Sequence, residues 1–226
     1  LKEEALMVAD SLDQLVKRIN AANTLIFEEN EISAHSTDVS GFIRALAKAE
    51  VSIPNEITIL GGGATARSAI AAVDGRGRTI TVYSRSASRA VQLINSSLSA
   101  TVIVEDWARA QDGLSANLVI ATTPSGASDH LIPTDSNGTL FESLYSPWPT
   151  KLLAQWQKTG GHKYITPGAH DGSAIKYIDT RIIKSKRLPS PNSRYWGTLG
   201  NYKIKDFDYS WHHDETDEPF VYQFGN

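Results

Sequence analysis

A glycine-rich turn between a short apolar run and an alanine-rich stretch constrains the fold of this chain more than any other feature. Residues 57–60 have the pattern of a buried strand, three glycines follow at 61–63, and a helix is predicted to about Val73. Strand-like and helical stretches then alternate at 79–83, 86–96, 101–104, 117–121 and 139–145. This alternation indicates βαβ units with right-handed crossovers, and therefore an α/β protein with a Rossmann-like parallel sheet.

The turn has the G-x-G-x-x-A spacing of a dinucleotide-binding loop. Gly61 would permit the tight turn, Gly63 the close approach of the backbone to a pyrophosphate, and Ala66 the close packing of helix on strand. The N–H groups at the start of the helix would point at the phosphates. The predicted cofactor-binding residues of this turn are Gly61, Gly62, Gly63, Ala64, Thr65 and Ala66. A glycine turn that binds no nucleotide is the alternative.

The end of the second strand of this region indicates which dinucleotide would bind. An NAD site carries Asp or Glu there, which binds the ribose 2′-hydroxyl. This chain has Ser84, Arg85, Ser86 and Arg89 instead, and their guanidinium and hydroxyl groups suit a 2′-phosphate. The sequence therefore predicts NADP. The alternative is a solvated basic first turn of a helix, although cations are unfavourable at that end.

The pattern before and after this region differs. Apolar residues at helical spacing predict one amphipathic helix over residues 3–19, followed by an apolar run at 24–27, a candidate strand at 31–35 and a helix at 39–50. After about residue 162 the periodicity weakens, and the pattern gives no structural prediction for this part of the chain. Because the helical pattern begins at once, we expect that the natural N-terminus precedes Leu1.

Composition excludes several classes of protein. A net charge of −3 gives no reason to expect a nucleic acid or an anionic membrane as partner. No apolar run approaches the roughly 18 residues of a membrane span. There is no cysteine, so disulfides and thiolate metal sites are excluded. The adjacent His212 and His213 define no ligand geometry, so we predict no metal site. From the lack of a membrane span we expect a soluble, cytoplasmic protein.

Seven short motifs occur in order along the first two thirds of the chain. They are Lys2-Glu3-Glu4-Ala5, Asn23-Thr24-Leu25, Ser36-Thr37-Asp38 with Gly41-Phe42, the glycine turn, Ser84 to Arg89, Ala121-Thr122-Thr123-Pro124-Ser125-Gly126, and Leu144-Tyr145-Ser146-Pro147-Trp148-Pro149-Thr150. Together they resemble shikimate dehydrogenases over about residues 1–161. The resemblance implies a remnant of a substrate-binding, catalytic domain at 1–50 and an NADP-binding domain at 55–161, and it leaves 162–226 as an unassigned tail.

The resemblance also implies a reaction, the reversible NADPH-dependent reduction of 3-dehydroshikimate to shikimate in aromatic amino-acid biosynthesis. Lys2 and Asp38 match the catalytic pair of the family. A lysine ammonium can polarise the ketone and donate a proton to the developing alkoxide, while a carboxylate holds its orientation. Without the resemblance, Lys2 would be a solvated terminal residue and Asp38 a helix N-cap.

Further site residues follow from the same resemblance. Asn23 and Tyr145 match substrate-binding residues, and Thr123 would lie near the nicotinamide ribose. The alternatives are a turn or strand-end residue for Asn23, a half-buried sheet tyrosine for Tyr145, and a simple Pro-Ser-Gly turn after Thr123. We expect the small-molecule substrate as the partner, with no nucleic acid or membrane, and a monomer or homodimer.

The chain departs from the family pattern at several positions. Ser36 and Ala121 stand where the family usually has Asn, and Glu142 where it prefers Asp. The family's Ser-x-Ser segment would precede Leu1, and no counterpart of its closing glutamine helix follows Ile165. Two alternatives therefore stay open: a catalytically impaired nucleotide-binding fragment or pseudoenzyme, and a quinate/shikimate dehydrogenase that uses NAD.

Overall fold

A computed structural model describes residues 2–28, 30–134, 137–144 and 149–160, together with the two strands at 164–165 and 220–223. The chain forms two compact units. Unit 1 contains Leu1–Thr37 and Thr180–Asn226, and unit 2 contains Asp38–Asp179. Among the described residues, none of the helices is long and apolar enough to cross a membrane.

Unit 1 is a small α/β unit whose sheet has four strands. Its elements are α1 (Ala5–Val8), β1 (Ser11–Leu12), α2 (Gln14–Ile19), β2 (Thr24–Phe27), β3 (Ile32–His35) and β10 (Phe220–Gln223). The strand order is β1-β3-β2-β10, with β1 parallel to β3 and the other pairs antiparallel. Apolar side chains of the two helices, such as Val16, pack with Leu25, Ile32 and Ala34 from the sheet to form the core.

The prediction of one helix over residues 3–19 is wrong, because polar side chains divide that segment. The Asp13 carboxylate accepts a hydrogen bond from the Val16 N–H at 2.6 Å and caps a new helix, α2. The Asp10 carboxylate accepts a hydrogen bond from the Ile32 N–H at 2.9 Å. This contact holds the next two residues, Ser11 and Leu12, beside β3 as strand β1. Asn20 then ends α2 in the left-handed conformation, at φ 49°.

Unit 2 contains the predicted strands and helices between residues 39 and 145, together with three elements that were not predicted, at 107–115, 151–158 and 164–165. They are α3 (Asp38–Lys48), β4 (Glu56–Leu60), α4 (Ala64–Val73), β5 (Thr79–Ser84), the 3₁₀ helix η1 (Ala87–Arg89), α5 (Ala90–Asn95), β6 (Thr101–Asp106), the 3₁₀ helix η2 (Trp107–Ser115), β7 (Leu118–Ala121), β8 (Thr139–Glu142), α6 (Lys151–Lys158) and β9 (Tyr164–Ile165).

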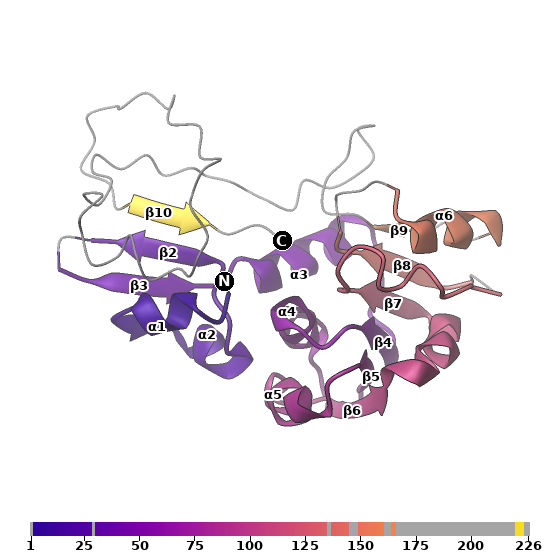
Figure 1. Ribbon diagram of the computed structural model, residues 1–226, viewed down its shortest axis with the longest axis horizontal. Helices are drawn as coiled ribbons and strands as arrows, with labels where there is room; N and C mark the ends of the chain where they lie inside the picture. The colour runs from indigo at the N-terminus through magenta and orange to yellow at the C-terminus, as the bar shows by residue number, and fades with distance from the viewer. Residues whose placement is uncertain are drawn as a thin grey trace. The chain divides into compact units, whose positions relative to one another are not determined.

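The six strands of unit 2 form one parallel sheet in the order β6-β5-β4-β7-β8-β9 (Figure 1). This is the doubly wound order in which the direction of winding reverses between β4 and β7. The predicted fold class is therefore confirmed, with a Rossmann-like sheet in unit 2 and an α/β unit before it.

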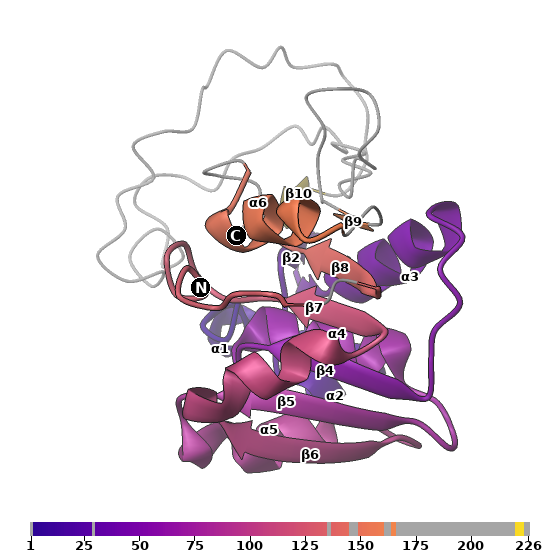
Figure 2. The ribbon, with the colours of Figure 1, turned by 90° about the vertical axis from the view of Figure 1, so that its right-hand side faces the viewer.

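Both faces of this sheet are covered, as its nearly continuous apolar strands require. On one face Leu60, Val119 and Leu140 pack against η2 and α6, whose Trp156 is fully buried. On the other face lie α3, α4 and α5 (Figure 2). There the Phe42 ring of α3 lies 4.9 Å from the Phe141 ring of β8, measured between centroids.

Helix α3 packs against α4 and belongs to unit 2, whereas the sequence analysis assigns residues 1–50 to one domain. The amphipathic pattern of residues 39–50 predicts a helix correctly but does not reveal which neighbour covers its apolar side. The division of the chain into a substrate domain, a cofactor domain and a tail remains a prediction.

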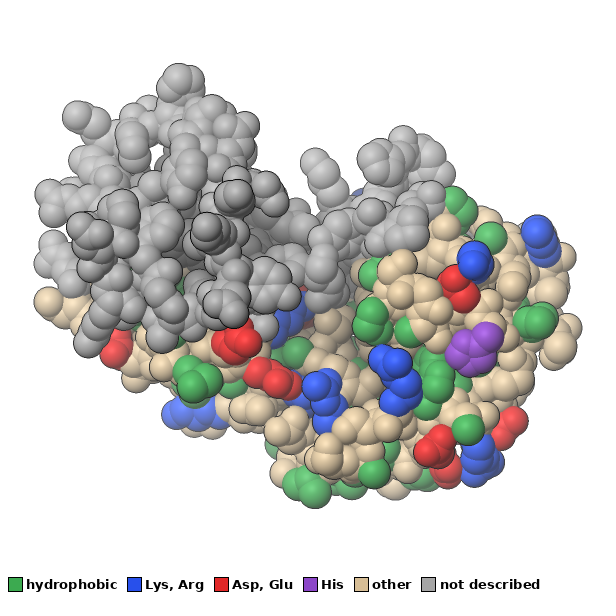
Figure 3. Space-filling view, in the orientation of Figure 1, with side chains coloured by type: hydrophobic (Ala, Val, Ile, Leu, Met, Phe, Trp, Pro, Cys, Tyr) green, Lys and Arg blue, Asp and Glu red, His purple; other side chains and the backbone are tan. Residues whose placement is uncertain are grey.

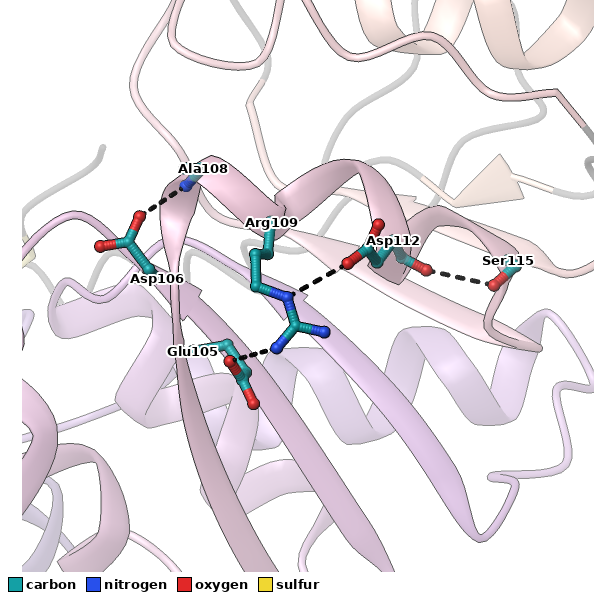
Figure 4. Close-up of polar contacts among 6 residues, drawn as sticks. All are labelled: Glu105, Asp106, Ala108, Arg109, Asp112 and Ser115. Carbon is teal, nitrogen blue, oxygen red and sulfur yellow. Dashed lines mark hydrogen bonds and ion pairs between the residues drawn. The ribbon is translucent and has the colours of Figure 1, made fainter.

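Charged side chains of both signs alternate over the described part of the face in Figure 3. One such group lies beyond the end of β6, where Arg109 contacts Glu105 at 2.9 Å and Asp112 at 3.3 Å (Figure 4). Asp106 accepts from the Ala108 N–H at 2.7 Å and so caps η2. This network fixes the link between strand and helix, and exposed ion pairs of this kind contribute little stability.

Asp74 has a larger structural role at the end of α4. Its carboxylate accepts hydrogen bonds from the N–H groups of Leu98, Ser99 and Ala100 and from the Ser97 hydroxyl, at 2.7–3.1 Å. Burial alone would raise the pKa of Asp74, but these four hydrogen bonds hold it below its ordinary value. The carboxylate therefore joins the turn after α5 to the end of α4.

We predict that Asp74→Ala lowers the free energy of unfolding by about 1–3 kcal/mol at neutral pH, because several donors lose a charged acceptor. Since the folded pKa lies below the ordinary value of 3.8, this stability is present above that value and is lost as the pH falls through the folded pKa. Urea denaturation at neutral and acidic pH measures both effects. The control Asp112→Ala, at an exposed ion pair, should change stability by less than about 0.5 kcal/mol.

Candidate functional site

The candidate site lies at the carboxyl ends of β4 and β7, where the strand order reverses. In sheets of this order, ligands bind in the crevice outside these strand ends. Leu60 ends β4 and pairs with Ala121, the last residue of β7. The Leu60 carbonyl accepts two hydrogen bonds from Thr122, one from its N–H and one from its hydroxyl, both at 2.8 Å. Thr122 thus holds the two strand ends together.

Gly61 follows immediately and needs to be glycine for two separate reasons. Its φ of +105° lies in a region that side chains rarely adopt, and a Cβ atom would lie 2.8 Å from the Thr122 hydroxyl oxygen. The Gly61 N–H donates to the Tyr83 carbonyl at 2.9 Å, so the turn is tied to β5 as well. The chain therefore leaves β4 in a turn with no room for a side chain.

The next two glycines bring the backbone to the start of α4. A Cβ atom on Gly62 would overlap the Ser84 side chain at the end of β5. Gly63 is the N-cap of α4 and brings no side chain to its N–H groups. Ala64 and Thr65 form the first turn of this ten-residue helix, and Ala66 is fully buried behind it. This geometry is the one that the G-x-G-x-x-A pattern predicts.

The basic and hydroxyl side chains after β5 lie next to the glycine turn. The Arg89 guanidinium donates to the Gly62 carbonyl at 3.4 Å. Ser84 is buried and accepts from the Ser86 N–H at 3.2 Å, while Arg85 is exposed. The structure therefore brings at least Arg89 and Ser84 to the turn, from positions more than twenty residues further along the chain.

Thr123 is buried at the end of β7, with its hydroxyl directed into its own loop. Its Oγ1 donates to the Ser128 hydroxyl at 3.3 Å, and Gly126 turns the loop with a φ of +80°. The turn alternative for this segment is therefore present in the structure. A contact of Thr123 with a cofactor remains a prediction.

In unit 1, Asn23 is almost completely buried and binds the chain just before Asp38. Its carbonyl oxygen accepts from the Thr37 N–H at 2.9 Å and from the Thr24 hydroxyl at 3.0 Å. Its amide nitrogen donates to the Thr37 hydroxyl at 2.8 Å. Asn23 therefore fixes Thr37, and its contact with a substrate remains a prediction.

The predicted catalytic pair is divided between the two units. Lys2 lies in the turn before α1, where its carbonyl accepts from the Ala22 N–H at 2.9 Å. Asp38 begins α3, where a carboxylate is favourable at the positive end of the helix dipole. Their pairing remains a prediction from the sequence. Tyr145 lies outside the described residues.

Two threonines that hold these segments together, Thr122 and Thr37, were not predicted as site residues. Thr122 and Thr37 each stand inside a quoted motif, but no pattern separates them from neighbouring hydroxyl residues. Their partners, Leu60 and Asn23, are 62 and 14 residues away. Among the described residues, no group of His, Asp and Glu could hold a metal ion.

Comparison with known proteins gives the following relatives. No family model matches the chain. It is 34% identical over 182 residues to "Shikimate dehydrogenase (NADP(+))" of Methanosarcina acetivorans, covering 74% of this chain and 64% of the relative. The crystal structure of Mycobacterium tuberculosis shikimate dehydrogenase is similar with a TM-score of 0.59 and 26% identity, over 73% of this chain and 62% of that one. The Thermus thermophilus shikimate 5-dehydrogenase structure "in complex with NADP(H) and shikimate" gives 0.58 and 25%, over 73% and 62%.

We predict that Gly61→Ala destabilises unit 2 by more than the roughly 1–2 kcal/mol expected for a left-handed backbone alone, since its Cβ also meets Thr122. Urea denaturation provides the measurement. Gly77→Ala is the matched control, because its φ of +79° is similar but a Cβ there meets nothing within 4 Å. An equal loss of unfolding free energy in the two variants would contradict the close contact between Gly61 and Thr122, at the strand ends where the order of the sheet reverses.

Proposed function

Because this chain belongs to the shikimate dehydrogenase family, we propose that the complete protein reduces 3-dehydroshikimate to shikimate reversibly with NADPH. The chain spans about six tenths of the length of the curated relatives it matches. The observation that carries the proposal is the turn at Gly61–Gly63, which lies at the switch point with the Arg89 guanidinium on the Gly62 carbonyl. This arrangement suits a phosphate-containing dinucleotide.

The proposed cofactor is NADP. The pyrophosphate would lie at the N-terminus of α4, above the glycine turn. Ser84, Arg85, Ser86 and Arg89 would bind the 2′-phosphate through hydroxyl and guanidinium donors, and no carboxylate stands at the end of β5 to repel it. The names of the relatives, which specify NADP(+), support this choice.

The proposed chemistry needs a hydride and a proton. NADPH supplies the hydride when it is bound. The Lys2 ammonium would polarise the ketone of the substrate and donate a proton to the developing alkoxide, and would act as the base in the reverse direction. The Asp38 carboxylate would orient the ammonium, while Asn23 and Tyr145 would bind hydroxyl groups of the substrate. A cytoplasmic location and a monomeric or homodimeric state are part of the same proposal.

The decisive assay follows the NADPH absorbance band with shikimate plus NADP, and in parallel with quinate plus NAD, using the complete protein. The proposed function requires turnover with the first pair. Turnover with quinate and NAD in its place would favour the quinate/shikimate alternative, against which Arg85 and Arg89 argue. Turnover with neither pair, together with NADP binding, would identify a nucleotide-binding pseudoenzyme.

We predict that Arg89→Ala weakens NADP binding about tenfold and leaves NAD binding nearly unchanged, because one charge-assisted contact with the 2′-phosphate is lost. Isothermal titration calorimetry with each dinucleotide measures the change in selectivity. Arg76→Ala is the control, since Arg76 is an exposed arginine in the turn between α4 and β5, at the other end of the sheet. An unchanged ratio of the two dissociation constants in Arg89→Ala would remove the 2′-phosphate argument.

We predict that Lys2→Ala lowers kcat by about 10²–10⁴-fold in the complete protein, the range typical for loss of a proton donor. NADP affinity should stay within about twofold, because Lys2 is not part of the proposed nucleotide site. Steady-state kinetics and calorimetry provide the two readouts. Lys17→Ala, at an exposed lysine of α2, should change neither. Parallel loss of turnover and NADP binding would contradict a catalytic role.

A further inference from the structure

Glu142 is a buried carboxyl group at the end of β8 that the proposed chemistry does not use. It is only 2% exposed. It lies in register with Ala121 and shares its face of the sheet with Leu140, in the layer that packs against η2 and α6. An ionisable group in such an apolar layer loses hydration, so it needs compensating hydrogen bonds.

Two hydrogen bonds compensate the carboxyl group. Oε1 accepts from the Leu144 N–H at 3.1 Å, and Oε2 accepts from the Thr150 hydroxyl at 2.8 Å. Thr150 is the N-cap of α6, and its hydroxyl oxygen accepts from the Leu153 N–H at 3.2 Å. The carboxyl group therefore anchors both the chain that leaves β8 and the first turn of α6.

The same chain leads back to the glycine turn. Ser143 follows Glu142, and its N–H and hydroxyl both donate to the Ala121 carbonyl, at 3.0 and 2.7 Å. The next residue, Thr122, makes the two hydrogen bonds to Leu60 directly before the turn. A continuous series of backbone and hydroxyl contacts therefore joins Glu142 to the candidate cofactor site.

The neutral and ionised forms of Glu142 are similarly stable close to neutral pH. Burial raises its pKa to about 7, while the hydrogen bonds from Thr150 and Leu144 oppose the increase. The titratable and charged groups on the segments that cover this face are Arg109, Asp112, Asp129, His130, Lys151 and Lys158, and Tyr83 lies on the sheet itself. Arg109 pairs with Asp112, and Lys151 pairs with Asp129 at 2.9 Å.

The two protonation states make different hydrogen bonds. An ionised carboxylate accepts from both Leu144 and Thr150, which leaves the Thr150 oxygen to accept from Leu153. A protonated carboxyl group has an O–H of its own, and when this O–H donates to the Thr150 oxygen, the hydroxyl hydrogen of Thr150 has to rotate toward another acceptor. One proton therefore reverses the direction of the contact between β8 and α6.

We propose that Glu142 is a positioning residue for the proposed reaction, whose protonation state sets the hydrogen bonds at Leu144 and at the first turn of α6 and thereby the shape of the cofactor site. Its effect on catalysis rests on the proposed function. Its effect on Leu144, Thr150 and Leu153 does not, so the two can be tested separately.

The local effect is tested by hydrogen exchange of the Leu144 and Leu153 amides, measured by NMR between about pH 5.5 and 8.5, which brackets the pKa of about 7. After correction for intrinsic exchange, both protection factors should change with one midpoint near neutrality. Glu142→Gln should abolish the transition. The matched control Glu105→Gln, which changes a partly exposed carboxylate near the end of β6, should retain the transition. Protection that titrates in Glu142→Gln, or that differs in midpoint between the two amides, would overturn the proposal.

The functional effect is tested by NADP binding over the same pH range. The dissociation constant of the wild type should change about fivefold more across the transition than that of Glu142→Gln. Titration of the nucleotide phosphates is common to all variants, so this difference reports the protein. Thr150→Val should lose the additional pH dependence of the dissociation constant, whereas Thr150→Ser, which keeps a hydroxyl group, should retain it. Identical profiles for wild type and Glu142→Gln would overturn the link to the site, whereas absence of NADP binding at any pH would refute the proposed function and leave the exchange result to decide the local role.

Discussion

The contact between the ends of β4 and β7 is the constraint on which the candidate site depends. Thr122 donates twice to the Leu60 carbonyl, and the space that these contacts occupy leaves no room for a side chain on Gly61. The turn is therefore forced close to the sheet, and α4 starts directly above it with a glycine as its N-cap. A phosphate group can approach such a helix N-terminus because neither the turn nor the cap obstructs it.

Buried polar groups have a similar structural role within each unit. Asn23 fixes Thr37 in unit 1, and Glu142 fixes Leu144 and Thr150 in unit 2. In each case a side chain with little exposure finds hydrogen-bond partners for its own polar atoms, which offsets the cost of burying them. Asn23, which the sequence predicts as a substrate ligand, therefore has a structural role as well, and this role is compatible with the proposed reaction.

Most strands and helices of unit 2 could be predicted from periodicity, because their patterns depend on near neighbours. The elements η2, α6 and β9 were not predicted. The helix over residues 3–19 shows the limit of this approach. The apolar residues of this segment have helical spacing, but the carboxylates of Asp10 and Asp13 accept hydrogen bonds from backbone N–H groups and divide the segment. The N–H group that binds Asp10 belongs to Ile32, which is distant in the sequence. The position of Asp38 at the start of α3 was also foreseeable, although the packing of α3 on α4 was not.

By itself the sequence determined the alternation of strands and helices over most of unit 2, the position of the glycine turn and the absence of an acid after β5, because these depend on residues close together in the chain. Only the tertiary structure decided that Thr122 meets Leu60, that Arg89 reaches the Gly62 carbonyl and that Glu142 is buried. The physical reason is the parallel sheet, which places side by side strand ends that are separated by whole crossovers in the sequence.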